Sequence, residues 1–161
     1  MSFPLPSDAL DRELVFEFFW KFSAFECALK RSGFLRKKKA AEADWERFGE
    51  QISAKFSALG SPSFDEAVTK IRMLSPQRQM NNNGELTWER VEQRADESDA
   101  AYTLHLLKTA RNNLFHGGKY PDGPIFEIAR NREILRAALV VLDGCYELHP
   151  DIKHWISEIA A

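Results

Sequence analysis

The chain has 161 residues, of which 44% are hydrophobic and 29% are charged, and its formal net charge at pH 7 is −2. This length fits one domain that buries about two-thirds of the surface its unfolded chain exposes, so we expect residues 1–161 to form a single domain. The small negative charge argues against a protein that coats long nucleic acids nonspecifically, because such binding uses many phosphate contacts. It does not exclude a small site for a phosphate group.

The two cysteines, Cys27 and Cys145, lie in apolar segments without the spacing of metal ligands, and we interpret them as reduced core thiols. The first eleven residues lack the basic and apolar regions of a signal peptide. The longest later apolar run, Ala137–Leu142, is too short to cross a bilayer. We therefore expect a cytoplasmic protein that makes no membrane contact.

The first expected helix begins after an N-cap at Ser7 and runs to Ser32, before Gly33. Helical spacing gives it two apolar stripes on nearly opposite sides. The first stripe contains Leu14, Phe18, Phe22, Phe25 and Leu29, and the second contains Phe16, Trp20 and Cys27. A surface helix needs only one such stripe. Either this helix is central in the bundle or its second face meets another chain, and we slightly favour the interface.

A basic block follows, made of Lys30, Arg31, Arg36, Lys37, Lys38 and Lys39, whereas Glu85–Asp99 is mostly acidic. The block either attracts RNA or is a solvated loop between helices. The solvated loop is the preferred interpretation.

The next expected helix spans Ala40–Leu59, and a capping box at Ser63 predicts a shorter helix that stops near Pro76. We expect residues 77–85 to form a polar loop whose Asn-Gly pair makes a turn rather than an RNA contact. A short helical segment around Trp88 and Val91 is expected after it.

Three further helices complete the expected fold. The helix Ser98–Ala110 is followed by a loop at Gly117–Glu127, a helix capped by Asn131, and a final helix that begins at Pro150. The sequence shows neither a strand-like alternation nor a fixed repeat period. It predicts an all-α, single-domain bundle of five to six helices.

The most informative segment is Arg111–Lys119, which places an arginine, two amides and a histidine at a helix end followed by two glycines. Arg111 lies angularly among apolar positions, and a partly buried guanidinium needs an anion. That anion is either a scissile phosphate or a structural carboxylate, and the candidates for the latter are Asp96, Asp99 and Asp143. Beside Asn112 and His116, the phosphate is the better interpretation.

Other residues of this segment have less specific roles. Asn112 can bind a phosphate oxygen, orient the imidazole or cap the helix. Substrate-binding candidates are Asn113, Lys119 for a second phosphate contact and Tyr120 for stacking on a base, although each also fits an ordinary helix-end or loop role. His105, His149 and His154 lack the clustering of ligands, so we assign them no metal and no catalytic role, and we expect no cofactor.

Arg111 and His116 are five residues apart, which places them roughly 140° apart around an ideal helix. Either the glycine-broken helix end lets His116 swing round, or two copies of the motif share one site across a twofold axis. RNA cleavage by the 2′-hydroxyl needs a base and an acid, and histidine suits both roles near pH 7. One chain supplies one motif histidine and a homodimer supplies two.

The pattern Arg111-Asn112-x-x-x-His116 resembles the Arg-polar-x3-His signature of HEPN domains, helical bundles of prokaryotic toxin and defence proteins. The resemblance covers roughly Leu104–Cys145, and the preceding residues match only as generic helices. It implies a metal-independent endoribonuclease that acts on RNA as a homodimer, with Arg111, Asn112 and His116 in its composite site. It also implies, for a toxin, a cognate antitoxin such as a small nucleotidyltransferase.

Two alternatives remain beside the ribonuclease. Family members with a degraded motif are noncatalytic, so a HEPN-like module that binds a nucleotide, RNA or a protein is the second hypothesis. A plain helical dimerisation unit is the third, and the intact Arg111, Asn112 and His116 argue against it.

Overall fold

The computed structural model describes residues 11–115 and 128–161, which form six helices and one two-stranded sheet. The expected all-α class is confirmed. The elements in chain order are α1 (Arg12–Arg31), α2 (Trp45–Ser57), α3 (Pro62–Leu74), β1 (Arg78–Asn82), β2 (Glu85–Glu89), α4 (Asp99–Phe115), α5 (Ile128–Leu148) and α6 (Pro150–Ala160).

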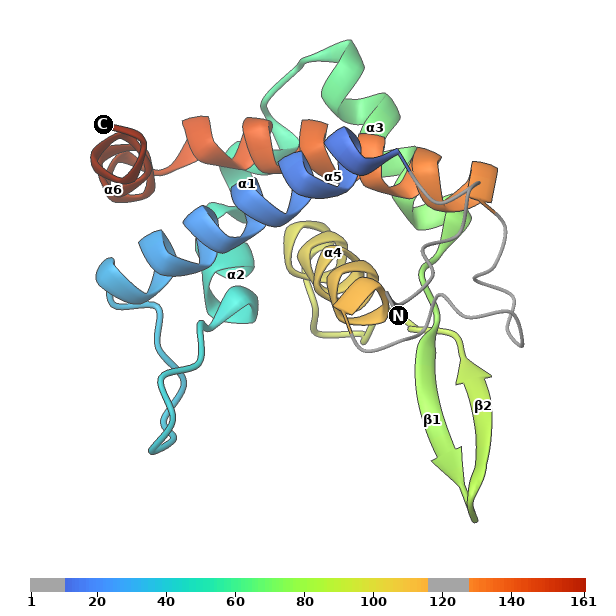
Figure 1. The fold of residues 1–161 in the computed structure, drawn as a ribbon. Helices are drawn as coiled ribbons and strands as arrows, with labels where there is room; N and C mark the ends of the chain where they lie inside the picture. The colour runs from blue at the N-terminus through green and yellow to red at the C-terminus, as the bar shows by residue number, and fades with distance from the viewer. Residues whose placement is uncertain (1–10, 116–127) are drawn as a thin grey trace, which may run out of the picture.

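Helix α4 is the central element of the fold. Figure 1 shows it nearly end-on, with α1 and α5 passing above it, α2 on one side and the β1–β2 hairpin on the other. Ten of its residues are buried, and the two buried threonines donate their hydroxyls to helix carbonyls one turn back. A helix that is buried on several sides must satisfy its polar groups internally. The few α4 positions that reach solvent are therefore candidates for function.

Helix α1 packs through one of its two apolar stripes. Its first stripe is buried in the core, whereas Phe16 is 67% and Trp20 is 50% exposed. The alternative of a central α1 is wrong, and its second face is open in the monomer. The predicted cap is also wrong: Ser7 lies outside the described residues, and the helix begins after Asp11, whose carboxylate accepts from two backbone N–H groups.

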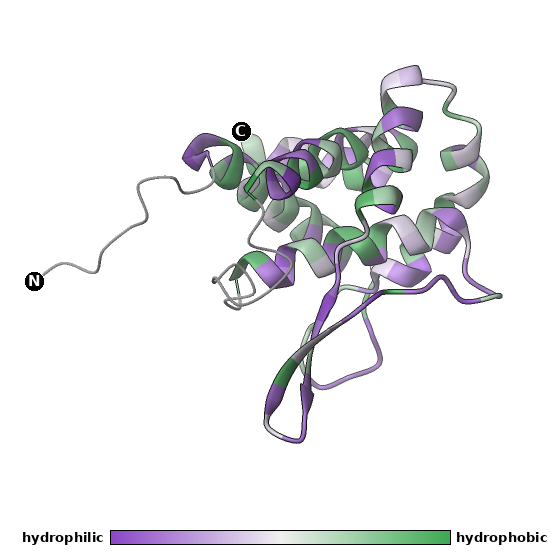
Figure 2. Cartoon of the chain, turned by 90° about the vertical axis from the view of Figure 1, so that its right-hand side faces the viewer, coloured by the Kyte–Doolittle hydropathy of each residue, from purple (hydrophilic) through white to green (hydrophobic). Residues whose placement is uncertain are grey.

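An antiparallel hairpin replaces the predicted loop at residues 77–85 and the predicted helical segment around Trp88. Its strands pair from Arg78 opposite Glu89 to Asn82 opposite Glu85. Its two-residue turn is Asn83-Gly84, both with positive φ (53° and 93°), as the Asn-Gly pair predicts. Figure 2 shows the hairpin as mostly hydrophilic. The strands were not predicted because β1 is almost entirely polar and β2 offers only the pair Leu86 and Trp88 in alternation, which is too short a pattern to indicate a strand.

Two predicted helix starts are corrected by the structure. Helix α2 begins at Trp45 rather than near Ala40, because the Asp44 carboxylate caps it. Helix α3 begins at Pro62, so Ser63 lies inside it and makes no capping box. Proline suits the first turn of a helix, where its missing N–H is not needed.

The last two helices confirm one predicted start and correct the other. Helix α5 begins at Ile128, and Asn131 is buried within its first turns rather than capping it. Helix α6 begins at Pro150, as expected. No described helix is long and apolar enough to cross a membrane.

The cysteines are both free in the structure. Cys145 is buried in the core, and burial raises the pKa of its thiol, which keeps it neutral. Cys27 is half-buried on the second face of α1.

Helices α2 and α4 approach each other closely at Gly49. A Cβ atom at this position would lie 2.5 Å from the Cα and 2.7 Å from the N of Ala101. Both are backbone atoms, so neither can move without shifting α4. The missing side chain of Gly49 therefore sets the distance between the two helices.

Replacing Gly49 with alanine tests this contact. At an exposed helix site the change would stabilise by about 1 kcal/mol, because alanine is the better helix former. Here we expect a loss of about 1–3 kcal/mol in the free energy of unfolding, because the core is overpacked. Urea denaturation measures it, with exposed Ala54→Gly on α2 as the control for helix propensity alone. A stabilised Gly49→Ala protein would contradict the close approach.

Candidate functional site

Arg111 lies near the C-terminal end of α4, because the helix continues past the expected Ala110 to Phe115. Its guanidinium carbon is 5.3 Å from the ring centre of Phe115 and 5.7 Å from that of Phe22. Its Nη1 donates to Oδ1 of Asn112 at 3.1 Å. The side chain is half-buried and is held by two aromatic rings and one amide.

The carboxylate interpretation of Arg111 finds no support in the described residues. No carboxylate among them lies within ion-pair distance (4.0 Å) of its guanidinium. The three expected carboxylates pair with other cations: Asp96 with Arg94, Asp99 with Arg72, and Asp143 with Lys21. The hydrogen bond from Arg72 lowers the pKa of Asp99, which stabilises that carboxylate in its charged form.

Asn113 is buried, and its Nδ2 donates to the backbone oxygen of Gln77 at 2.7 Å. This hydrogen bond ties the segment before β1 to the end of α4. The remaining predicted site residues, His116, Lys119 and Tyr120, lie outside the described residues. Of the predicted catalytic set, the structure thus brings Arg111 and Asn112 together.

An exposed aromatic surface lies beside Arg111. We define it as Phe16, Phe19 and Trp20 on α1 together with Phe115 on α4, all of them exposed. Phe19 and Phe115 join the two helices, with ring centres 5.3 Å apart. Contiguous exposed apolar patches commonly mark interaction surfaces. Phe115 contacts Phe19 within the aromatic surface and also contacts the guanidinium of Arg111. The aromatic surface therefore adjoins Arg111.

A cavity of about 530 Å³ lies on a different face of α4. His105, Lys108 and Asn112 line it from this helix, at the i, i+3 and i+7 spacing that shares one face. Arg111 does not line it. The other walls come from α2, β1 and the segments that contain Arg36 and Glu97.

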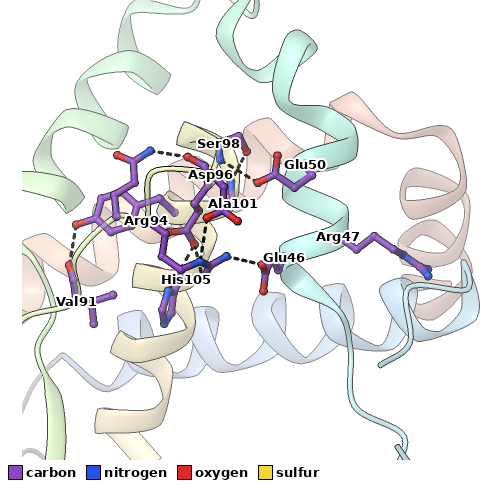
Figure 3. A network of polar contacts seen from close by, with 12 residues as sticks. Glu46, Arg47, Glu50, Val91, Arg94, Asp96, Ser98, Ala101 and His105 are labelled. Carbon is purple, nitrogen blue, oxygen red and sulfur yellow. Dashed lines mark hydrogen bonds and ion pairs between the residues drawn. The ribbon is translucent and has the colours of Figure 1, made fainter. Parts of the chain in front are cut away.

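His105 is part of a polar network in this cavity (Figure 3). Its Nδ1 lies 3.7 Å from Oε1 of buried Glu97, which also contacts Arg94. Burial lowers the pKa of His105 and outweighs the opposing effect of Glu97. Arg94 also pairs with Glu46 of α2, so the network connects α2 to the start of α4.

His105 was not predicted as part of a site, because a histidine without neighbouring ligands gives no metal signal in the sequence. A usable signal was present, because His105, Lys108 and Asn112 form a polar stripe at helical spacing beside the apolar positions of this helix. Among residues 11–115 and 128–161, no group of three or more His, Cys, Asp or Glu side chains is placed to hold a metal ion.

Comparison with known proteins found no match among family models, curated proteins or solved structures. The resemblance to HEPN domains stays an expectation based on the motif. The function of the chain must be inferred from the chemistry of the site itself.

Comparing two arginines tests whether Arg111 has a structural role. Arg111→Gln removes contacts with two rings and a hydrogen bond to the adjacent Asn112 but no described ion pair, so we expect the free energy of unfolding to fall by less than about 1 kcal/mol. Arg72→Gln removes hydrogen bonds to Gln93 and Asp99 at 2.7 and 3.0 Å, and we expect a larger loss of about 1–3 kcal/mol. Urea denaturation measures both. Equal losses would assign Arg111 a structural role.

Proposed function

We propose that the protein is a metal-independent endoribonuclease that acts as a homodimer with a composite active site. The observation that carries this proposal is the environment of Arg111. Its guanidinium is half-buried at the end of α4, held by Asn112 and two rings, and has no carboxylate partner among the described residues. A guanidinium fixed in this way is ready to bind a phosphate.

Arg111 and Asn112 would bind the scissile phosphate. The forked N–H donors of arginine can follow the phosphate oxygens as negative charge develops at phosphorus. Asn112 uses its Oδ1 to accept from Arg111, so its amide N–H groups remain available to a phosphate oxygen.

His116 would transfer the protons. One imidazole removes the proton of the 2′-hydroxyl, the 2′-oxygen attacks phosphorus, and the bond from phosphorus to the 5′-oxygen breaks. A second imidazole, protonated, donates its proton to the leaving 5′-oxygen. The products are a 2′,3′-cyclic phosphate and a free 5′-hydroxyl.

The homodimer supplies the second imidazole. The aromatic surface beside Arg111 supports such a dimer, because pairing two copies there would bury the exposed rings next to both motifs. In a twofold dimer each chain presents the same surface to the other, so both motifs approach one axis.

The biological class is proposed from the resemblance of the motif. An intact motif of this kind is typical of toxin and defence effectors in the cytoplasm, whose partners include a neutralising antitoxin such as a small nucleotidyltransferase. The noncatalytic HEPN-like binding module is the alternative, and the activity test below separates the two.

RNA cleavage is the direct test. Purified protein should cleave total RNA in excess chelator, spare a 2′-deoxy substrate and leave 2′,3′-cyclic phosphate ends. His116→Ala should lose about 10²- to 10⁴-fold in rate, because positioned proton transfer contributes that much. Arg111→Lys should also fail, since an ammonium lacks the forked donors. The matched control is His154→Ala, which removes an exposed histidine on α6 and should keep full activity.

Three results would contradict this mechanism: loss of activity in chelator with rescue by Mg²⁺ or Mn²⁺, equal cleavage of the 2′-deoxy substrate, or full activity of His116→Ala. RNA binding without cleavage would instead favour the noncatalytic module.

The dimer is tested separately by light scattering coupled to gel filtration. The wild-type protein should have twice its chain mass of 18.5 kDa. Trp20→Glu should shift it to the monomer mass, because an unpaired carboxylate buried in an interface costs several kcal/mol. Met73→Glu is the control, since Met73 is 77% exposed on α3, a helix that contributes no residue to the aromatic surface. A monomeric wild-type protein at micromolar concentration would exclude the shared site.

A further inference from the structure

The cavity beside α4 carries more positive charge than its own acids neutralise. Its two carboxylates, Glu46 and Glu97, both pair with Arg94, and Glu46 also lies 3.9 Å from Nη2 of Arg36. Lys108, which also lines the cavity, is half-buried and makes no hydrogen bond or ion pair with the described residues. Burial and the nearby Arg36 lower the pKa of Lys108, and they outweigh the opposing effect of Glu42 and Glu26. Neither of these carboxylates is within ion-pair distance (4.0 Å) of the ammonium.

Two further donors at the cavity walls are buried without a partner. The indole Nε1 of Trp45 makes no hydrogen bond in the structure, and Trp45 is 3% exposed. The Nε of Arg36 is buried and unbonded in the same way. Leaving a buried donor unsatisfied is destabilising, so such groups call for an explanation. An acceptor held in the cavity would supply one.

We propose that this cavity is a binding site for a nucleoside monophosphate unit, with Lys108 and Arg36 as the main contacts to its phosphate. The ligand is either a free mononucleotide or one nucleotide of an RNA strand. The chemistry is the same in both cases: a phosphate bound by cations and a nucleoside that fills the remaining space.

The volume argues for more than a phosphate ion. Small-molecule sites commonly enclose about 300–1,000 Å³, and this cavity lies within that range at about 530 Å³. Polar groups for a sugar or a base are present in the amides of Gln79 and Asn112. Arg78 adds a further cation from β1, although it also pairs with Glu89 at 3.0 Å.

The site is distinct from Arg111 but connected to it. Asn112 lines the cavity and also accepts the hydrogen bond from Arg111. An RNA strand bound at Arg111 could therefore continue into the cavity. Binding here does not require cleavage, so this inference can hold even where the proposed ribonuclease activity fails.

Isothermal titration calorimetry on the full chain tests the site with adenosine 5′-monophosphate, inorganic phosphate and adenosine. The monophosphate should bind one per chain, inorganic phosphate more weakly, and adenosine, which lacks the charge, more weakly still. Lys108→Met should reduce the affinity for the monophosphate about tenfold or more, because it removes a charge-assisted hydrogen bond. Lys108→Arg should retain most of the affinity.

Lys153→Met is the matched control, since Lys153 lies on α6, pairs with Glu147 and does not line the cavity. It changes the net charge equally and should leave binding unchanged. A melting curve shows whether the Lys108→Met protein is folded. If it is not folded, the affinity of the Lys108→Arg protein is still compared with that of the wild type.

A decanucleotide of 2′-O-methyl RNA distinguishes the two sources of the phosphate, because its blocked hydroxyls prevent cleavage. Binding of the strand that depends on Lys108 and is displaced by the monophosphate indicates a strand subsite. Binding of the monophosphate alone indicates a free nucleotide as ligand. The proposal is wrong if neither binds, or if Lys108→Met and Lys153→Met weaken binding equally.

Discussion

The fold depends on the close packing of α4 against α2. A Cβ atom at Gly49 would lie within 2.5 Å of the α4 backbone at Ala101, so the two helices meet without an intervening side chain. This approach buries the N-terminal half of α4, where small residues such as Ala100 and Ala101 dominate the contact. Close-packed interiors tolerate little change in spacing, and the orientation of α4 is therefore fixed along its length.

In that fixed orientation, α4 presents polar side chains at two places. One is the stripe of His105, Lys108 and Asn112, which lines the cavity. The other is Arg111, which turns toward α1 and rests on Phe22 and Phe115. Functional groups on a rigid helix keep their geometry better than groups on loops. Asn112 lines the cavity and also accepts the hydrogen bond from Arg111. This shared amide is the physical link between the proposed catalytic motif and the proposed nucleotide site.

Local patterns in the sequence predicted those structural features that local interactions determine. The buried stripe of α1, the Asn83-Gly84 turn and the start of α6 at Pro150 follow from spacing and backbone preferences, and the structure confirms them. The exposed hairpin was not predictable in this way, because its strands are mostly polar. The burial of Asn131 was not predictable either, because tertiary packing determines it. The cavity also required the fold, since Arg36, Trp45 and Lys108 are far apart in the chain. Arg111 and Asn112 were found from the motif because they are neighbours.

The distribution of ion pairs explains how a chain of net charge −2 can bind phosphate. The acidic stretch 85–99 would repel RNA if its carboxylates were free. Most of them instead pair with arginines: Glu89 with Arg78, Glu92 with Arg90, Asp96 and Glu97 with Arg94, and Asp99 with Arg72. Arg111 and Lys108 remain as half-buried cations without a carboxylate at ion-pair distance among the described residues. Local pairing, rather than the total charge, determines where an anion can bind, because charges beyond about 10 Å are largely screened in 0.1 M salt.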